Sequence, residues 1–262
     1  MHIDLTRIQR EMDQFGFSVL KNVIDIQMIN LIHSRSDKYY EADHKRFGSE
    51  FLKEINELEI VRNVFEYDSI FIDFLESHEI FDLLAEKLLH KYAIIHNFNL
   101  IRLLPDFKTK MLGHEWHRDV FYFGPGIRTA INIFIPLEKT NQDNGATKVL
   151  PGSHLYKELP PIEDIDIYQK SVNLEVGDIL IGDAATYHRA GNNQSKKART
   201  ILSLKYTLSF FTQQYNFCKM LPVDQYSENL RNRLGYKVRV PESLEQLRVL
   251  PNDRLYKWPI RF

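Results

Sequence analysis

The sequence contains one cysteine, Cys218, among 262 residues. A single thiol excludes an internal disulfide and a cysteine-based zinc cluster, and it is typical of proteins from a reducing compartment. Any metal ion bound within this chain would therefore need histidine and carboxylate ligands.

The sequence also lacks an excess of either charge. Its 34 Lys and Arg residues nearly balance its 35 Asp and Glu residues, which gives a formal charge of −1. Proteins that bind nucleic-acid phosphates usually carry a basic excess, so we expect no nucleic-acid partner. The first residues, MHIDLTRIQREMDQ, contain no continuous apolar run, so we expect neither a signal peptide nor a membrane span. We predict a cytoplasmic protein.

The composition is otherwise that of a globular chain with a full core. Hydrophobic residues make up 44% and aromatics 12%, and the chain shows no internal repeat, low-complexity tract or long linker. A chain of this length can form one domain around a β-barrel or sandwich. We predict a single domain over residues 1–262, with a helical part at about 1–92, a β core at about 93–211 and an extension at about 212–262.

The hydrophobic pattern changes near residue 93. Before it, helical spacing predicts a helix capped by Asp25 and another over FIDFLESHEIFDLLAEKLLHKY, with a break near Ser77. After it, alternating segments predict strands at AIIHNFNLIRLL, TAINIFIPLE, TKVLPGS, DILIGDA and ARTILSLKYTLSFF. Helices are predicted again around DQYSENLRNRLG and PESLEQLRVL. Short successive strands are typical of a barrel or sandwich, so we predict a mainly β fold with flanking helices.

The segment HEWHRD, residues 114–119, combines two histidines with two carboxylates. The zinc motif HExxH would need a histidine four residues after His114, where this chain has Arg118. His117 and Asp119 are a better pair, because side chains two apart on a strand project from the same face. A third ligand must then come from elsewhere in the chain. Two histidines and one carboxylate with open coordination positions are typical of non-haem Fe(II) oxygenases.

His188 and Arg199, which are eleven residues apart, supply two further parts of such a site. The spacing is enough to close a turn and to begin the next strand. An Fe(II) oxygenase that uses 2-oxoglutarate needs a cation for the buried distal carboxylate of this co-substrate. An arginine suits this role, because its planar guanidinium binds a carboxylate through two parallel hydrogen bonds.

Several segments together resemble the phytanoyl-CoA dioxygenase family of Fe(II)- and 2-oxoglutarate-dependent oxygenases. They are HRD at 117–119, DNGATKVLPGSHLY at 143–156, YHRAGNNQ around His188, Arg199, and QFGFSVLKNVID near the amino terminus. The resemblance spans most of the chain. It implies a double-stranded β-helix, which is a jelly roll or cupin-like barrel. It also implies that His117, Asp119 and His188 ligate iron and that Arg199 binds the distal carboxylate of 2-oxoglutarate.

The resemblance extends to residues around this set. Arg102 resembles a position that contacts 2-oxoglutarate or substrate in some relatives, with an ion pair at the barrel rim as the alternative. Phe134 lies where relatives often have a tryptophan beside the co-substrate. Ala190 replaces a serine that helps to hold the co-substrate in relatives, so we expect Thr129 or Ser203 to supply that hydroxyl.

Strand alternation and local motifs give three further expectations. Lys205 and Tyr206 are adjacent on the last predicted strand, so only one of them can face a cavity. We expect His114 to be a loop histidine that does not ligate the metal, with a residue that lines the pocket or relays a proton as the alternative. We expect His154, in LPGSH, to be structural because Pro151 and Gly152 form a turn there.

The implied function is hydroxylation of an unactivated C–H bond in a small molecule, with Fe(II), 2-oxoglutarate and dioxygen, and with release of succinate and CO2. Related halogenases have a small residue in place of the carboxylate ligand, so Asp119 favours hydroxylation or another two-electron oxidation. One alternative is a non-catalytic jelly-roll protein that binds a metabolite. Another is a divalent-metal hydrolase or isomerase, which would not need Arg199. Neither the substrate nor the oligomeric state follows from the family.

Overall fold

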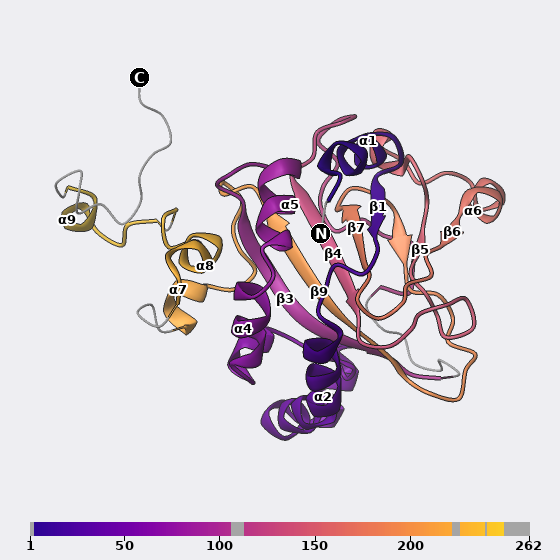
Figure 1. Ribbon diagram of the computed structural model, residues 1–262, viewed down its shortest axis with the longest axis horizontal. Helices are drawn as coiled ribbons and strands as arrows, with labels where there is room; N and C mark the ends of the chain where they lie inside the picture. Colours follow the sequence, from indigo (N-terminus) through magenta and orange to yellow (C-terminus); the bar gives the residue numbers. More distant parts are fainter. Residues whose placement is uncertain (1–2, 106–112, 222–225, 239, 249–262) are drawn as a thin grey trace.

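A six-stranded antiparallel sheet forms the centre of the computed structural model, which describes residues 3–105, 113–221, 226–238 and 240–248 (Figure 1). Its strand order is β1-β7-β4-β9-β3-β2, with β1 at Phe17–Leu20, β2 at Ile60–Val61, β3 at Ile94–Leu103, β4 at Ala130–Pro136, β7 at Ile179–Asp183 and β9 at Arg199–Thr207. A second antiparallel sheet has the order β6-β5-β8, with β5 at Lys148–Val149, β6 at Lys170–Ser171 and β8 at His188–Arg189. The predicted strand segments are thereby confirmed.

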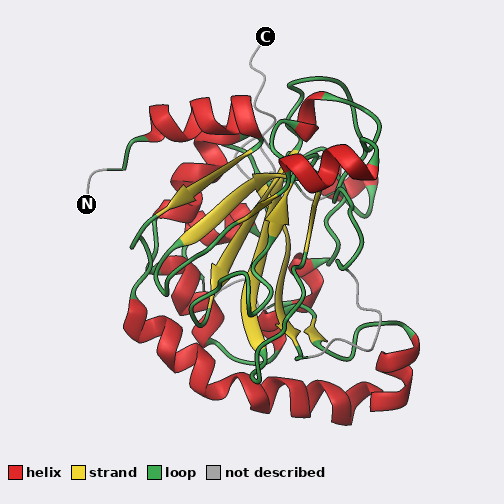
Figure 2. Cartoon of the chain, turned by 90° about the vertical axis from the view of Figure 1, so that its right-hand side faces the viewer, coloured by secondary structure: helices red, strands yellow, loops and turns green. Residues whose placement is uncertain are grey.

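Helices cover one side of the large sheet and extend beyond it (Figure 2). Their bounds are α1 Leu5–Phe15, α2 Ile26–Phe47, α3 Ser49–Glu54, α4 Ile70–Glu76, α5 Ile80–Leu88, α6 Ile162–Tyr168, α7 Phe217–Met220, α8 Glu228–Arg233 and α9 Leu244–Leu247, with 3-10 turns η1 at Val64–Glu66 and η2 at Ser153–Leu155. The carboxylate of Asp25 accepts a hydrogen bond from the amide of Gln27, which confirms this N-cap. The predicted break is also confirmed, because α4 ends at Glu76 with Ser77 as its C-cap and α5 begins at Ile80.

The expectation of a mainly β fold was wrong in its proportions. The described helices together contain more residues than the described strands, so the chain is a mixed α and β structure with antiparallel sheets. The prediction counted each alternating segment between 93 and 211 as a strand. One of these, TKVLPGS, forms only the two-residue strand β5, and loops occupy much of the span between the strands.

The main hydrophobic core lies between the helices and one face of the large sheet. Ile131 and Ile133 of β4, together with Leu202 and Leu204 of β9, are fully buried in this core. The rings of Phe71 and Phe74 from α4 pack against Phe98 of β3, with centroids 5.9 and 6.3 Å apart. A smaller cluster of Val149, Val172, Leu174 and Leu180 lies between the two sheets. Alternate side chains of β3, β4 and β9 therefore face this second space.

A β-bulge in β3 decides which of its side chains face which side. The register with β9 shifts between Ile95 and Asn97, so one extra residue, His96, is accommodated there. After the shift, Phe98 is in the main core, whereas Asn97 and Asn99 line a cavity on the opposite face. Asn97 pairs with Lys205 across the sheet, and Lys205 pairs in turn with Asn132 of β4.

Within the part of the chain that the structure describes, none of the helices combines the length and the apolar character that a membrane span requires.

Candidate metal centre

A cavity of about 520 Å³ lies on the face of the large sheet that is turned toward β8. This volume is in the usual range for a site that binds a small molecule. The lining includes Asn97, Asn99, Ile101, Leu103, His114, His117, Asp119, Phe134, Thr147, His188, Ala190, Arg199, Ser203 and Lys205. The cavity therefore brings together both histidines and the aspartate of the predicted ligand set, as well as the predicted arginine.

His117, Asp119 and His188 each offer one ligand atom, and these three atoms lie within 4.8 Å of one another. Nε2 of His117 is 3.5 Å from Oδ1 of Asp119, and Nε2 of His188 is 3.9 Å from Oδ2. The two histidines are held opposite each other by a pair of backbone hydrogen bonds, each 3.1 Å long. Residues 71 positions apart in the sequence thus present their imidazoles to one point.

Backbone carbonyls orient both imidazole rings. Nδ1 of His117 lies 2.8 Å from the carbonyl oxygen of Glu115, and Nδ1 of His188 lies 3.0 Å from that of Thr186. A carbonyl oxygen can only accept, so each Nδ1 carries the proton and each Nε2 keeps its lone pair free. This is the tautomer that a metal-ligating histidine needs when Nε2 is the ligand atom.

The surroundings of the three groups shift their pKa values in different directions, and they keep the aspartate ionised. Burial alone would raise the pKa of Asp119, but the charge of Lys205 and the contact with His117 hold that pKa well below its usual range. Burial lowers the pKa of His188. For His117, the effect of burial is outweighed by Asp119, and its pKa is raised. A divalent cation fits this donor set of two imidazole nitrogens and one carboxylate oxygen.

Two residues outside the predicted set contact Oδ2 of the Asp119 carboxylate. Nδ2 of Asn132 donates to Oδ2 of Asp119 at 2.7 Å, and Nζ of Lys205 lies 3.1 Å from the same oxygen. Lys205 faces the cavity while Tyr206 is buried in the main core, so the expectation that only one of them faces it is confirmed. Asn132 was missed, although a polar residue at the centre of the apolar strand TAINIFIPLE is a signal in the sequence.

Arg199 is buried, with a relative exposure of 2%, and its guanidinium lines the cavity. Nη2 donates to the carbonyl oxygen of Gly145 at 2.5 Å, whereas Nε has no hydrogen-bond partner among the described residues. Burial lowers the pKa of Arg199 to about 10, so the group is still charged at neutral pH. A buried cation with an unsatisfied N–H requires an anion, and a carboxylate is the best geometric match.

The structure places two of the other predicted residues away from this cavity. Arg102 shares a strand face with Phe98 and Leu100, as expected, but that is the helix-covered face. Its guanidinium lies 2.5 Å from Glu59 and 3.9 Å from the ring centre of Tyr40. This arrangement is the ion pair that we considered as the alternative, and it gives no support to a role in co-substrate binding.

Thr129 also lies on the side away from the cavity. Its backbone carbonyl accepts hydrogen bonds from the amide of Leu208 and the hydroxyl of Thr207, and its side chain is not part of the described lining. Ser203, the other candidate hydroxyl, does line the cavity. The reason is alternation, because Ser203 pairs with Phe134 across the sheet and both point into the cavity.

Phe134 and His114 both contribute to the cavity wall. The ring of Phe134 lies 5.8 Å from that of His188, measured between centroids. His114 is a loop residue outside the three-residue ligand group, as expected, but it lines the cavity. Burial and the charges of Arg199 and Arg189 lower its pKa. His154 is buried elsewhere, with Nε2 3.2 Å from the carbonyl oxygen of Asp13, in agreement with a structural role.

Arg118, between the two ligand candidates in the sequence, points away from the cavity, as an extended chain requires. It donates hydrogen bonds to the backbone carbonyls of Ser153, Tyr156 and Lys157, and it lies over the ring of Tyr187 at 4.0 Å. The segment that carries His117 and Asp119 is thereby tied to the loop around η2.

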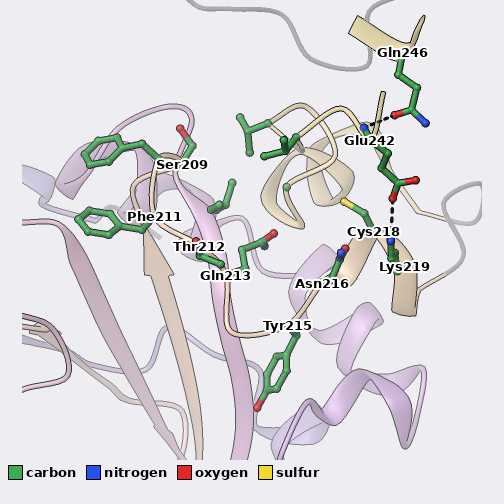
Figure 3. A pocket seen from close by; sticks show the side chains of 15 residues that line it. Ser209, Phe211, Thr212, Gln213, Tyr215, Asn216, Cys218, Lys219, Glu242 and Gln246 are labelled. Atoms are coloured by element: carbon green, nitrogen blue, oxygen red, sulfur yellow. Dashed lines mark hydrogen bonds and ion pairs between the residues drawn. The ribbon is translucent and has the colours of Figure 1, made fainter. Parts of the chain in front are cut away.

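A second cavity, of about 400 Å³, lies between the end of β9 and the carboxyl-terminal helices (Figure 3). Its wall includes an ion pair of 2.9 Å between Lys219 and Glu242, and a hydrogen bond of 2.8 Å from the amide of Glu242 to Gln246. Among the described residues, the only cluster of metal-ligating type lies in the other cavity. The chemistry is therefore assigned to the space between the sheets.

The chain matches the family model for phytanoyl-CoA dioxygenase (PhyH) over residues 12–201. The matched region covers most of the chain and includes all four residues of the site. The protein therefore belongs to the phytanoyl-CoA dioxygenase family, a family of Fe/2-oxoglutarate-dependent dioxygenases, and His117, Asp119 and His188 are its candidate facial triad.

Relatives of known sequence agree with this assignment. "Uncharacterized protein Rv1501" of Mycobacterium tuberculosis is 28% identical over 259 residues, which cover 97% of this chain and 94% of the relative. The iron/alpha-ketoglutarate-dependent dioxygenase ausO of Aspergillus calidoustus is 28% identical over 211 residues, with coverage of 73% and 68%. Among solved structures, the non-haem monooxygenase ThoJ in its nickel complex superposes with a TM-score of 0.62 at 19% identity, over 81% of this chain and 80% of that one. The last likeness shows a common fold.

Proposed function

We propose that this protein is a non-haem Fe(II)- and 2-oxoglutarate-dependent dioxygenase that hydroxylates an unactivated C–H bond of a small molecule. In this proposal His117, Asp119 and His188 hold the iron, and Arg199 binds the distal carboxylate of 2-oxoglutarate. Residues 1–262 act as one domain, and the two sheets around the cavity belong to a double-stranded β-helix. The observation that carries the proposal is the convergence of the three donor atoms in the cavity that also contains the buried guanidinium of Arg199.

Each of these side chains has a task that its surroundings support. Bound iron, with 2-oxoglutarate and dioxygen, would supply the oxidative decarboxylation to succinate and CO2 and the oxidising power for hydroxylation. The carbonyl contacts of Nδ1 keep Nε2 of His117 and His188 available as ligands. The low pKa of Asp119 keeps its carboxylate ionised at neutral pH.

The walls between the metal centre and Arg199 suit an elongated dicarboxylate. Ile101, Leu103 and Ile201 supply apolar surface that excludes water from the carbon chain, and Arg199 supplies the cation at one end. In this proposal the hydroxyl of Ser203, which lines the cavity, replaces the serine that relatives have at Ala190. A hydrolase or isomerase would not need a second buried cation in the cavity of its metal, so Arg199 favours the oxygenase.

Anaerobic titration of the protein with Fe(II) and 2-oxoglutarate tests this function. We expect a metal-to-ligand charge-transfer band when both are present, and succinate formation after oxygen is admitted. His188→Ala should lose both signals, whereas His90→Gln, a histidine outside the cavity, should retain them. Binding of 2-oxoglutarate without any succinate formation would support the alternative of a non-catalytic metabolite-binding protein.

A further inference from the structure

Lys205 lies at the centre of a polar row that crosses three strands on the cavity face. It is directly opposite Asn97 of β3 on one side and Asn132 of β4 on the other. Asn97 and Asn132 are buried, and the side chain of Lys205 is only 12% exposed. A row of this kind, next to the ligand candidate Asp119, is unlike the apolar pattern on the other face of the same strands.

Among the residues that the structure describes, the ammonium of Lys205 has one anionic partner, Oδ2 of Asp119 at 3.1 Å. Asn132 donates to the same oxygen. A metal ion at the triad would also bind the carboxylate of Asp119. Lys205 would then share its counter-ion with a divalent cation, and a largely buried charge in that position needs a further anion.

In the proposed function, 2-oxoglutarate cannot be that anion. One of its carboxylates is assigned to Arg199 and the other, with the keto oxygen, to the metal. Lys205 also lies six residues beyond Arg199 along β9, which at the usual rise of a strand separates their Cα atoms by about 20 Å. The two cations thus lie at different ends of the cavity, and the triad contacts the Lys205 end through Asp119.

The charges that line the cavity also favour an anionic ligand. The lining contains four cationic side chains, Arg62, Arg189, Arg199 and Lys205, against the two carboxylates of Glu115 and Asp119. Arg62 is neutralised by Glu57, whose carboxylate lies 2.6 Å away. Glu138 acts electrostatically on Arg199 from outside the lining, whereas Lys205 has Asp119, a ligand candidate, as its counter-ion.

On the basis of the proposed function, we infer that the primary substrate is a carboxylic acid whose carboxylate binds Lys205. Asn97, directly opposite Lys205 across the sheet, can act as a second donor, because its Nδ2 has a hydrogen left after the one it gives to Gln214 at 2.6 Å. A carboxylate fits better than a phosphate dianion, because the single charge of one ammonium balances a carboxylate but leaves part of a dianion's charge unbalanced in a largely buried site. Lys205 is thereby a specificity-determining residue.

The test uses trifluoroacetate as a carboxylate probe on Co(II)-loaded protein saturated with 2-oxoglutarate. Cobalt is paramagnetic, so the ¹⁹F relaxation rate of the probe reports binding near the metal, with Zn(II)-loaded protein as the diamagnetic reference. We expect a saturable enhancement that Lys205→Met reduces about tenfold and Lys205→Arg retains. The control is Lys219→Met in the second cavity. The side chain of Lys219 is 67% exposed, and this variant should behave as the wild type.

Three results would overturn the inference. The wild type with bound Co(II) and 2-oxoglutarate could give no enhancement, or the neutral probe trifluoroacetamide or inorganic phosphate could bind as well as the carboxylate. Lys205→Met could also lose Co(II) itself, which would make Lys205 a positioning residue for Asp119. Failure of the proposed function has a different signature, because the wild type would then bind no Co(II) or 2-oxoglutarate in the first place.

Discussion

The two faces of the six-stranded sheet differ in almost every physical respect, although the same strands build both. On the helix-covered face, β9 contributes Leu202, Leu204 and Tyr206, which are buried in the main core. On the cavity face it contributes Arg199, Ser203 and Lys205. The first face stabilises the fold by burying apolar surface, and the second holds polar groups that burial penalises.

This comparison shows how the chain can place charged groups inside a protein. Asn97, Asn132 and Lys205 on the cavity face each have an apolar neighbour one residue away that is buried in the main core. The cost of burying these polar groups is thereby offset by the strands that carry them. Substitutions of adjacent residues should therefore have different kinds of effect.

The largest effect is expected from Asp119→Ala. Removal of one ligand from a three-ligand set should abolish metal binding and lower substrate-coupled succinate formation by about three orders of magnitude or more. Metal affinity by isothermal titration and succinate release measure the two effects. Asp166→Ala, at an exposed position on α6, is the matched control. Full activity in Asp119→Ala would remove this aspartate from the ligand set.

Adjacent substitutions on β9 test the comparison directly. Leu202→Ala leaves a cavity in the main core and should lower the free energy of unfolding by about 2–5 kcal/mol. Ser203→Ala, on the other face, should change it by about 1 kcal/mol or less and should instead raise the KM for 2-oxoglutarate. Urea denaturation and steady-state kinetics separate the two outcomes. Equal losses of stability in both variants would contradict the division between the faces.

Arg199→Gln should raise the KM for 2-oxoglutarate about a hundredfold. The amide retains hydrogen-bonding capacity but loses the charge and the two parallel N–H groups that fit a carboxylate. Metal binding should change little, because Arg199 is not among the three ligand atoms. Kinetics at saturating Fe(II) provide the measurement. An unchanged KM would place the co-substrate elsewhere.

Arg102→Gln tests the helix-covered face, as Arg199→Gln tests the cavity face. This arginine pairs with Glu59 on the helix-covered face, so its loss should lower stability by about 1–2 kcal/mol. The KM for 2-oxoglutarate should be unaffected. Thermal and urea denaturation, with kinetics on the same preparation, test both statements. A raised KM with unchanged stability would restore the co-substrate role suggested by the family resemblance.

The smallest effect concerns pH. Burial raises the pKa of Glu138 to about 7 from its ordinary 4.5, so the folded state binds an additional proton between these values. The contribution of Glu138 to the free energy of unfolding is therefore fully present below about pH 4.5 and decreases as the pH rises toward about 7. Glu138→Gln still accepts the hydrogen bond from the amide of Thr200 and should remove this slope. Urea denaturation at about pH 5 and pH 8 compares the two proteins. Parallel pH dependences in both would contradict the assignment.

Local signals explain why much of the fold was predictable. Asp25 precedes a run with helical spacing, and it caps α2 as expected. Alternation in the last long strand correctly predicted that only one of Lys205 and Tyr206 faces a cavity. Arg102 shows the limit of alternation. The pattern correctly placed it with Phe98 and Leu100, but it did not reveal that this shared face is the one that the helices cover.

The sequence by itself determined the chemical inventory of the site. One cysteine left histidine and carboxylate as metal ligands, and the spacing of His117 and Asp119 placed them on one face of an extended segment. Only the tertiary structure decided that His188, Arg199 and Lys205 meet these residues in the same cavity, and that Asn132 holds the aspartate. The reason is that strand pairing and the bulge at His96 set the register between distant segments, and register is a property of the whole sheet.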